Sequence, residues 1–517
     1  MSTETRTTKS LKNAAVNVFY LILQTILGFW SRKVFFDYLG SEVLGLDTTA
    51  GSLLNFLNIA ESGVGAAVAY FLYTPFYNKD TMAINDIVSL QGWIYRRIAS
   101  FILIAACVLM GFFPWIFSDI QIPLWYAYAT FTVLLIGNML GYFINYRESV
   151  LAADQKQYKV VKVTQAASIV FKIFLILYLP HASSPFLCYL GTTLLGYIIG
   201  CLWLNHVLRK EYPWLKSSTK TGQELTKEYP DMFKKIKQLF VHKIGGFVIL
   251  QCTPLIMYSF STLSIIAYYG NYLTVTEKIK GLMQQAFAST GAAVGNLIAS
   301  KDHDRVMKVF WELIDSRICF STIVVIILAL TTEPFISVWL SSDYLLSKKI
   351  LYLTLANVWL ALNRTPVDNY RDGFGLFQDV WAPAAESVIN LSVAVVCGFF
   401  WGIEGVLMGG IVSSLIVVYG WRPYYLYKHG FKLDFKHGFL RPYLSRILVA
   451  VLAFALFIYM ASFIHYNLDS YLSIFIYASI GTIIISASLY VSFCLLFPGM
   501  KSFHQRIKGL ILSKLRR

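Results

Sequence analysis

Several lysines lie deep inside apolar stretches of this sequence, where a positive charge is costly. Lys172 stands twelve residues into the apolar run 160–179, about 18 Å from its start at a helical rise of 1.5 Å per residue. Lys278 and Lys280 lie in the middle of the run 265–298. A charge at the centre of a bilayer costs at least ~2.5–3.5 kcal/mol on insertion scales. Each of these side chains therefore needs an acidic partner or an anionic ligand.

Helical spacing separates these lysines into two kinds. Glu277 precedes Lys280 by three residues, so the two side chains can meet on one helix face. Lys278 points elsewhere, and neither Lys278 nor Lys172 has an acidic residue one turn away. The alternative for all three lysines is a buried ion pair, for example with Glu61 or Glu277. Without such a pair, Lys172 and Lys278 are candidate cations for an anionic substrate.

Arg32 and Glu61 complete the set of candidate functional residues. Arg32 closes the first apolar run on its outer side, where it either reaches the interface or guards an outer gate. Glu61 lies in AESGVGAAVA, a small-residue stretch that permits close helix approach. It either pairs with a neighbouring helix or relays protons or cations. We predict that Arg32, Lys172, Lys278 and Lys280 bind substrate and that Glu61 couples transport to an ion.

Enzyme chemistry is not indicated by the sequence. There is no GxSxG, Walker A or HExxH pattern, and only eight histidines are present. The seven cysteines are scattered through apolar runs and form no CxxC pair. We expect no catalytic residue, no metal and no cofactor, and we expect active transport to be driven by a gradient.

Composition points to a membrane protein. The 517 residues are 57% hydrophobic and 14% charged, against about 25% charged in soluble domains. Apolar runs long enough to cross about 30 Å of hydrocarbon recur from end to end, so we predict an all-α polytopic membrane protein. About fourteen transmembrane helices are expected, at 14–31, 48–73, 98–117, 124–145, 160–179, 185–207, 238–259, 265–298, 316–331, 344–362, 380–400, 404–427, 447–464 and 473–497.

The distribution of Lys and Arg fixes the predicted topology. With the N-terminus inside, the inner segments hold thirty-six Lys and Arg, and the outer loops hold only Arg32, Lys33, Lys348 and Lys349. Such a bias places both termini in the cytoplasm. It also accounts for the net charge of +16 without a nucleic-acid partner, because no soluble basic domain is present.

A duplicated plan is suggested by the longest polar stretch between spans. This stretch separates six spans from the following eight, and each side opens with a span, a short outer turn and a small-residue-rich span. Duplicated halves are common in transporters. We predict an N-lobe at 1–207, a cytoplasmic inter-lobe loop at 208–237, a C-lobe at 238–430, and two additional helices with a basic tail at 431–517.

Five stretches resemble one transporter family when taken in order. They are 36–75, 142–158 with Ala153-Asp154-Gln155-Lys156 at its centre, 266–298 with Tyr269, Asn271, Tyr272, Gly295, Asn296 and Leu297, 334–340 (PFISVWL), and 402–414 (GIEGVLMGGIVSS). Together they resemble the polysaccharide flippases of the multidrug/oligosaccharidyl-lipid/polysaccharide (MOP) superfamily, especially the O-antigen and capsule repeat-unit branch.

The resemblance implies a fold, a substrate and a location. The fold is two six-helix lobes around a central cavity, with two extra C-terminal helices. The substrate is undecaprenyl-pyrophosphate carrying an oligosaccharide, moved by alternating access in the bacterial cytoplasmic membrane. A polysaccharide polymerase and glycosyltransferases are the expected protein partners. The candidate cations fit this substrate, since a pyrophosphate leaving water needs compensating positive charge.

Two other functions remain open from the sequence. A MATE-like ion-coupled antiporter of small molecules belongs to the same superfamily and predicts acidic residues in its cavity. An integral-membrane glycosyltransferase or polymerase predicts large outer loops, whereas the outer loops here are short.

Overall fold

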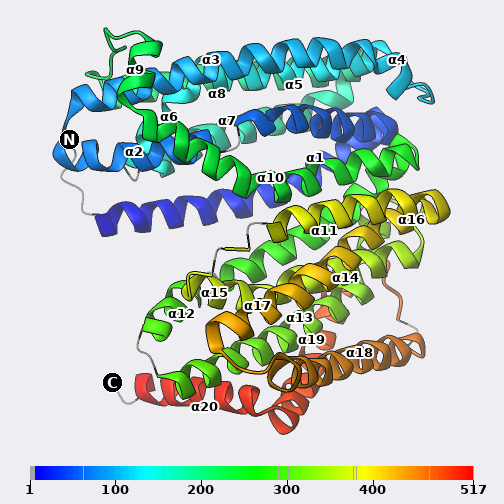
Figure 1. Cartoon of the computed structure of the whole chain (residues 1–517). Coiled ribbons are helices and arrows are strands. Elements are labelled where there is room, and N and C mark those ends of the chain that lie inside the picture. Colours follow the sequence, from blue (N-terminus) through cyan, green and yellow to red (C-terminus); the bar gives the residue numbers. More distant parts are fainter. Residues whose placement is uncertain are drawn as a thin grey trace. The chain divides into compact units, whose positions relative to one another are not determined.

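The computed structural model describes residues 6–515 except 62, 155, 288–289, 300–301, 377, 380 and 465. Its regular structure is helical, and no strand occurs among the described residues. The chain divides into two compact units, Met1–Ala267 and Tyr268–Arg517. Figure 1 shows the helices of each unit packed side by side. The prediction of an all-α fold is confirmed.

The described residues of the first unit form ten α-helices and the start of an eleventh. They are α1 (Arg6–Leu57), α2 (Val64–Asn78), α3 (Thr81–Gly111), α4 (Phe113–Ile116), α5 (Trp125–Phe143), α6 (Glu148–Ala153), α7 (Gln157–Tyr178), α8 (Pro185–Glu211), α9 (Gly222–Glu228), α10 (Pro230–Ser259) and α11 (Leu263–Ala286), which continues into the second unit.

The second predicted span is not one continuous helix. The chain turns at Gly40 (φ 79°) inside α1, and α1 then ends at Leu57. A 3₁₀ turn, η1 (Asn58–Glu61), follows, and Gly63 adopts φ 102° before α2 begins. Only glycine tolerates such a φ without strain. The small-residue stretch predicted to bring helices close therefore breaks the span, next to Glu61.

The predicted inter-lobe loop 208–237 is ordered against α3. The helix α8 runs to Glu211 and α10 begins at Pro230, which leaves a shorter connection that carries α9. Lys220 Nζ lies 3.0 Å from Asp86 Oδ2 of α3 and 2.7 Å from Glu228 Oε2. A Cβ on Gly222 would lie 2.1 Å from the Trp93 ring of α3, so this residue must be glycine for the contact to form. The lobe boundary itself stays a prediction.

The second unit is built around one long helix. Its helices are α12 (Thr290–Ala299), α13 (His303–Trp339), α14 (Lys348–Asn363), α15 (Thr365–Gly373), α16 (Trp381–Ser413), α17 (Arg422–Leu426), α18 (Arg441–Ser462), α19 (Tyr471–Leu496) and α20 (Pro498–Leu515). Of these, α13 packs against α14, α18, α19 and α20. Its apolar window is 72% buried, far more than any other candidate span.

The span 265–298 was predicted as one transmembrane helix. It is instead interrupted between α11, which ends at Ala286, and α12, which begins at Thr290. After the last predicted span, the chain forms a further helix, α20, which the span prediction did not include. Its N-terminal Gly499 fits closely, because a Cβ there would lie 2.5 Å from both Asp315 Oδ2 and the Trp311 carbonyl oxygen.

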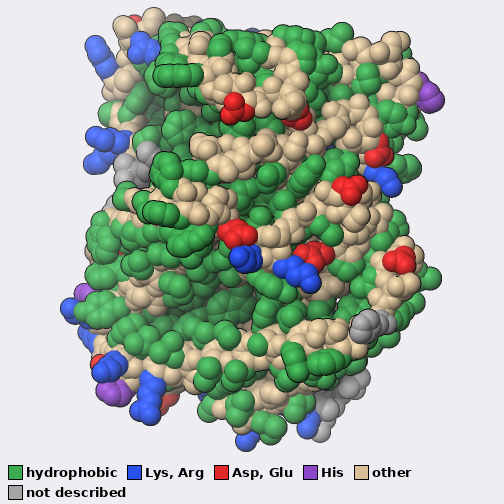
Figure 2. Space-filling model, turned by 90° about the vertical axis from the view of Figure 1, so that its right-hand side faces the viewer, with side chains coloured by type: hydrophobic (Ala, Val, Ile, Leu, Met, Phe, Trp, Pro, Cys, Tyr) green, Lys and Arg blue, Asp and Glu red, His purple; other side chains and the backbone are tan. Residues whose placement is uncertain are grey.

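Eight helical stretches of the described residues are long and apolar enough to cross a membrane. They are Thr81–Gly111, Trp125–Phe143, Gln157–His181, Pro185–Glu211, His303–Trp339, Trp381–Phe431, Lys436–Ser462 and Tyr471–Leu496. The face in Figure 2 is mostly hydrophobic and carries few charged side chains. Along α18, Leu448, Leu452 and Leu456 are each more than half exposed, as lipid-facing residues would be. The total of fourteen spans stays a prediction.

Candidate functional site

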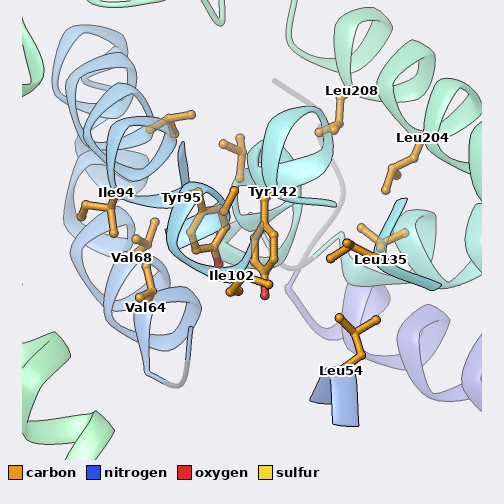
Figure 3. Packing of buried hydrophobic residues seen from close by; sticks show 14 of the residues in the cluster. Leu54, Val64, Val68, Ile94, Tyr95, Ile102, Leu135, Tyr142, Leu204 and Leu208 are labelled. Atoms are coloured by element: carbon orange, nitrogen blue, oxygen red, sulfur yellow. The ribbon is translucent and has the colours of Figure 1, made fainter. Parts of the chain in front are cut away.

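Glu61 lies at the break in the second predicted span and is held by two tyrosines. The Tyr95 hydroxyl of α3 donates to Glu61 Oε1 at 2.9 Å, and the Tyr142 hydroxyl of α5 donates to Oε2 at 3.0 Å. The Tyr142 hydroxyl also lies 3.0 Å from Asn58 Oδ1. Figure 3 shows both rings in the packed interior of the first unit. Hydrogen bonds to a carboxylate are stronger than neutral ones, so this arrangement fixes the Glu61 side chain.

A polar cavity of about 440 Å³ opens beside Glu61. Its wall includes Gln91 and Tyr95 from α3, Asn138 from α5 and Thr164 from α7. These residues come from three helices far apart in the sequence, and only Glu61 among the cavity's residues was predicted as functional. The cavity wall presents hydroxyl, amide and carboxylate oxygens. Such groups can relay a proton or coordinate a hard cation.

Glu148, the first residue of α6, lies in the wall of the same cavity. Burial, and after it the negative charge of Glu61, raises the pKa of the Glu148 carboxyl above its ordinary value. Sequence reasoning missed Glu148, although it falls inside the stretch 142–158 that carries the family resemblance.

Lys172 donates to the Gln24 side chain of α1, with Nζ 2.6 Å from Oε1. The two residues are 148 positions apart in the sequence. The Lys172 side chain is half-buried between α1 and α7, two helices that pack along each other. Glu61, the acidic residue considered as its partner, accepts hydrogen bonds from Tyr95 and Tyr142.

Arg32 is bound within the first unit. Its Nη2 donates to the Ala267 carbonyl oxygen at 3.0 Å, and the negative charge of Asp47 acts on its guanidinium. Asp47 Oδ1 accepts a hydrogen bond from the Tyr189 hydroxyl at 2.6 Å. Arg32 and Asp47 are on the two sides of the Gly40 turn, so the fold partly neutralises the arginine.

Lys278 and Lys280 differ as the spacing predicts. Lys280 Nζ lies 2.5 Å from a Glu277 carboxylate oxygen, which confirms the predicted pair on one helix face. Lys278 is exposed, and among the described residues no ion pair with it is found. Of the four predicted cations, Lys278 is therefore the one whose charge is most accessible.

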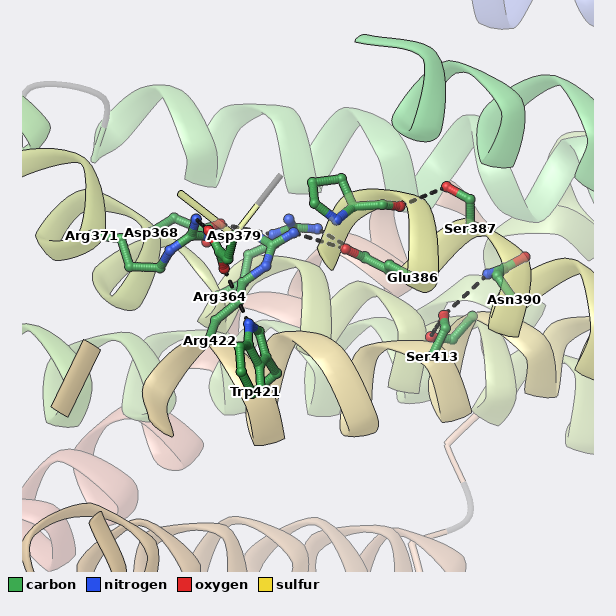
Figure 4. A network of polar contacts seen from close by, with 12 residues as sticks. Arg364, Asp368, Arg371, Asp379, Glu386, Ser387, Asn390, Ser413, Trp421 and Arg422 are labelled. Atoms are coloured by element: carbon green, nitrogen blue, oxygen red, sulfur yellow. Dashed lines mark hydrogen bonds and ion pairs between the residues drawn. The ribbon is translucent and has the colours of Figure 1, made fainter. Parts of the chain in front are cut away.

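A network of three arginines and three carboxylates lies in the second unit (Figure 4). Arg422 joins Asp368 Oδ1 at 2.7 Å and Glu386 Oε2 at 2.8 Å, and Arg364 Nε lies 2.9 Å from Asp368 Oδ2. Arg371 and Asp379 form the third pair, 2.7 Å apart. The charges balance, and half of the residues are almost fully buried. Such a network holds α15, α16 and α17 in one arrangement.

The Ala153-Asp154-Gln155-Lys156 stretch forms a structural cluster. Lys156 Nζ lies 2.7 Å from both Asp154 Oδ2 and Glu211 Oε1, and the Tyr212 hydroxyl donates to Asp154 at 2.9 Å. Burial opposes the charge on Lys156, but the hydrogen bonds to Asp154 and Glu211 outweigh it and raise the pKa of this lysine. Gln155 lies outside the described residues. Within the described residues, no group of three His, Cys, Asp or Glu side chains is placed to hold a metal.

Solved transporter structures share this fold. The lipid II flippase MurJ, in an inward closed conformation, matches with a TM-score of 0.65 at 15% identity, over 93% of this chain and 99% of that one. An inward-facing multidrug resistance MATE family transporter of the MOP superfamily matches with a TM-score of 0.54 at 13% identity, over 78% of this chain and 96% of that one. The sequence matches no protein-family model and no curated protein.

The class that fold and composition define is a multi-pass helical membrane protein with the fold of MOP-superfamily transporters. Its structural neighbours are transporters rather than enzymes. The predicted fold class, an all-α polytopic membrane protein, is confirmed.

Proposed function

We propose that this protein is a flippase that moves undecaprenyl-pyrophosphate-linked oligosaccharide repeat units from the cytoplasmic to the outer leaflet of the bacterial cytoplasmic membrane. It would act by alternating access and serve the synthesis of cell-surface polysaccharide. Polysaccharide polymerase and glycosyltransferases would be its partners in that membrane.

The main support is the extent of the likeness to the lipid II flippase. That structure accounts for 93% of this chain, whereas the MATE family structure accounts for 78%. About a fifth of the chain therefore has no counterpart in the MATE structure, while nearly all of it has one in a protein that moves a lipid-linked substrate. The five sequence stretches that resemble the repeat-unit branch point to the same substrate class.

In this proposal, Arg32, Lys172, Lys278 and Lys280 bind the pyrophosphate during transport. Lys278 is exposed, and Lys172 is bonded to a neutral amide oxygen of Gln24. Charge-assisted hydrogen bonds from lysine and arginine are the strongest that a phosphate group can accept. Arg32 and Lys280 already interact with Asp47 and Glu277 and would exchange these partners for substrate.

Glu61 would couple the conformational change to a proton or cation, together with Glu148. The break at Gly63 gives the second span two halves that can move separately. A proton or cation bound beside Glu61 would weaken the hydrogen bonds that hold Tyr95 and Tyr142 to Glu61. The ion would then bias which arrangement of the first unit is favoured.

The deciding experiment deletes the gene and measures where the lipid-linked oligosaccharide accumulates. Spheroplasts of the deletion strain should hold the repeat unit on the inner leaflet, protected from a membrane-impermeant glycosidase. Wild-type protein should restore its exposure. Glu61→Gln and Lys278→Met should not, although both proteins should be present in normal amounts. Lys349→Met, which removes an exposed lysine from α14, is the matched control and should restore exposure fully.

A repeat unit that reaches the outer leaflet normally in the deletion strain would contradict the proposal. Normal transport by Glu61→Gln at normal protein level would contradict the coupling role alone. Loss of folded protein in Glu61→Gln would assign Glu61 a structural role instead.

The MATE-like antiporter is the second candidate function. The acidic pair of Glu61 and Glu148 in a polar cavity is the observation that favours it, since an antiporter of small cations requires such residues. This alternative predicts that the deletion strain becomes sensitive to cationic dyes while the lipid-linked oligosaccharide is distributed normally. The two measurements on one strain therefore separate the candidates.

A further inference from the structure

An apolar groove of about 480 Å³ lies in the second unit, and none of its lining residues was predicted to be functional. Ala385 and Ile389 of α16 line it together with Trp421. Trp381 and Phe435 also line the groove. The volume falls within the range of about 300–1,000 Å³ typical of ligand sites.

The groove is preformed by the helix that lines it. Residues 414–421, η5 (Ser414–Trp421), are π-helical, a rare conformation that is frequent at functional sites. The side chain of Trp421 is fixed, because its Nε1 donates to Asp379 Oδ2 at 3.2 Å (Figure 4). Its ring lies 4.7 Å from that of Trp381, centroid to centroid. The lining also includes the small residues Ala385 and Gly420, which occupy little of the groove.

A lysine stands at the edge of the groove. Lys428 Nζ donates to the hydroxyl of Tyr424, a residue of the groove wall, at 3.3 Å and lies 5.6 Å from the centre of its ring. Lys428 is exposed, so its ammonium can also reach a ligand. The nearby carboxylate of Asp434 accepts from the backbone N–H of His437 at 2.7 Å and contacts its ring. Asp434 is thus engaged with His437.

The position of the groove along the chain favours a membrane lipid. All of its lining residues except Phe435 belong to the candidate span Trp381–Phe431, and Trp381 and Ile416 are each about half exposed, at 52% and 53%. In a bilayer, such exposed apolar surface meets acyl chains. Tryptophan and tyrosine collect at the membrane interface, and a lysine there attracts anionic headgroups.

We propose that this groove binds one acyl chain of an anionic phospholipid, whose phosphodiester is held by Lys428. One lysine matches the single negative charge of a phosphodiester. The site shares no lining residue with the proposed transport residues, and this proposal does not depend on which substrate the protein carries. A bound lipid would brace α16 against η5, next to the arginine–carboxylate network.

The test uses purified full-length protein in a neutral detergent and native mass spectrometry. Phosphatidylglycerol and phosphatidylcholine with identical acyl chains are the probes. Phosphatidylglycerol should bind more tightly. Lys428→Ala should weaken its binding about five-fold, the effect of about 1 kcal/mol per lysine near a membrane surface. Lys501→Ala, which removes an exposed lysine from α20, is the matched control and should change nothing.

A second variant tests the acyl-chain position. Ala385→Trp fills the groove and should reduce phosphatidylglycerol binding at least ten-fold, while Val396→Trp, at an exposed position of the same helix outside the groove, should not. Phosphatidylglycerol brominated on one acyl chain gives a measurement that does not need this variant. It should quench tryptophan fluorescence less in Trp381→Phe than in wild type.

Three results would overturn the proposal. The first is equal binding of the two phospholipids. The second is equal quenching by the brominated lipid in wild type and Trp381→Phe. The third is displacement of phosphatidylglycerol by undecaprenyl phosphate at equal concentration, which would assign the groove to the transported lipid.

Discussion

The ion pair between Asp315 and Arg446 allows a stability effect to be worked out from its surroundings. Asp315 of α13 is fully buried, and Arg446 of α18 is 6% exposed. Asp315 binds Arg446 and also accepts the Met500 backbone N–H of α20 at 3.1 Å. The guanidinium lies between two aromatic rings, 4.3 Å from that of Trp311 and 4.6 Å from that of Phe497. One pair therefore joins three helices of the second unit.

Arg446→Met should lower the free energy of unfolding of this unit by about 3–5 kcal/mol. Methionine keeps most of the contact with the two rings, so the loss comes mainly from leaving the Asp315 charge buried and unpaired. Asp315→Asn should lower the free energy of unfolding by a similar amount, because it leaves the Arg446 charge buried and unpaired. The double variant Asp315→Asn/Arg446→Met should cost much less than the sum, because it leaves no buried charge.

The assay is reversible denaturant unfolding of the purified protein, followed by hydrogen exchange in α20. Arg441→Met is the matched control, since this arginine is exposed at the start of the same helix. It should change the free energy of unfolding by less than about 1 kcal/mol. An additive double variant, or equal losses for Arg441→Met and Arg446→Met, would refute the reasoning.

Three further predictions follow from the topology, the broken span and the acidic cavity. Reporter fusions at both termini and in the connection that carries α9 should report the cytoplasm, and a terminus outside would contradict the Lys and Arg distribution. Gly63→Ala should destabilise the first unit by roughly 1–2 kcal/mol, because a φ of 102° is strained for alanine. Thermal unfolding measures the change in stability, and an unchanged midpoint would contradict the predicted strain. Glu148→Gln should raise stability near pH 7, because ionising this buried carboxyl costs free energy in the folded state. The gain should vanish below about pH 4.5, where the wild-type side chain is protonated in both states, and a gain that persists there would contradict the cause.

Local spacing gave the correct partner only where the partner was local. The pair Glu277 and Lys280 follows from helical geometry and is found. Lys172, by contrast, bonds to Gln24, which no pattern near Lys172 could reveal. Glu61 was placed in a close helix contact by its small neighbours, but its partners Tyr95 and Tyr142 come from α3 and α5. Hydrogen bonds between helices depend on which helix faces pack against each other, and the hydropathy pattern does not specify that packing.

Chain breaks were predictable only in part. The turn at Gly40 falls in the expected outer connection, and the kink at Gly402 falls between two predicted spans. The break at Gly63 falls inside a predicted span. Glycine is common in membrane helices, so a glycine alone does not indicate that the helix is broken there. An acidic residue beside the glycine, here Glu61, was the available signal.

The sequence by itself determined that the chain is a helical membrane protein, because long apolar runs in lipid must satisfy their own backbone hydrogen bonds. It also identified which charges lie at depth, since their positions in those runs need no tertiary contact to be read. Only the tertiary structure decided what each charge meets. It joined Glu61 to two tyrosines and Glu148 in one cavity, balanced three arginines with three carboxylates, and formed the apolar groove at η5. Those outcomes depend on helix packing between residues far apart in the chain, where side-chain shape and hydrogen-bond geometry select the neighbour.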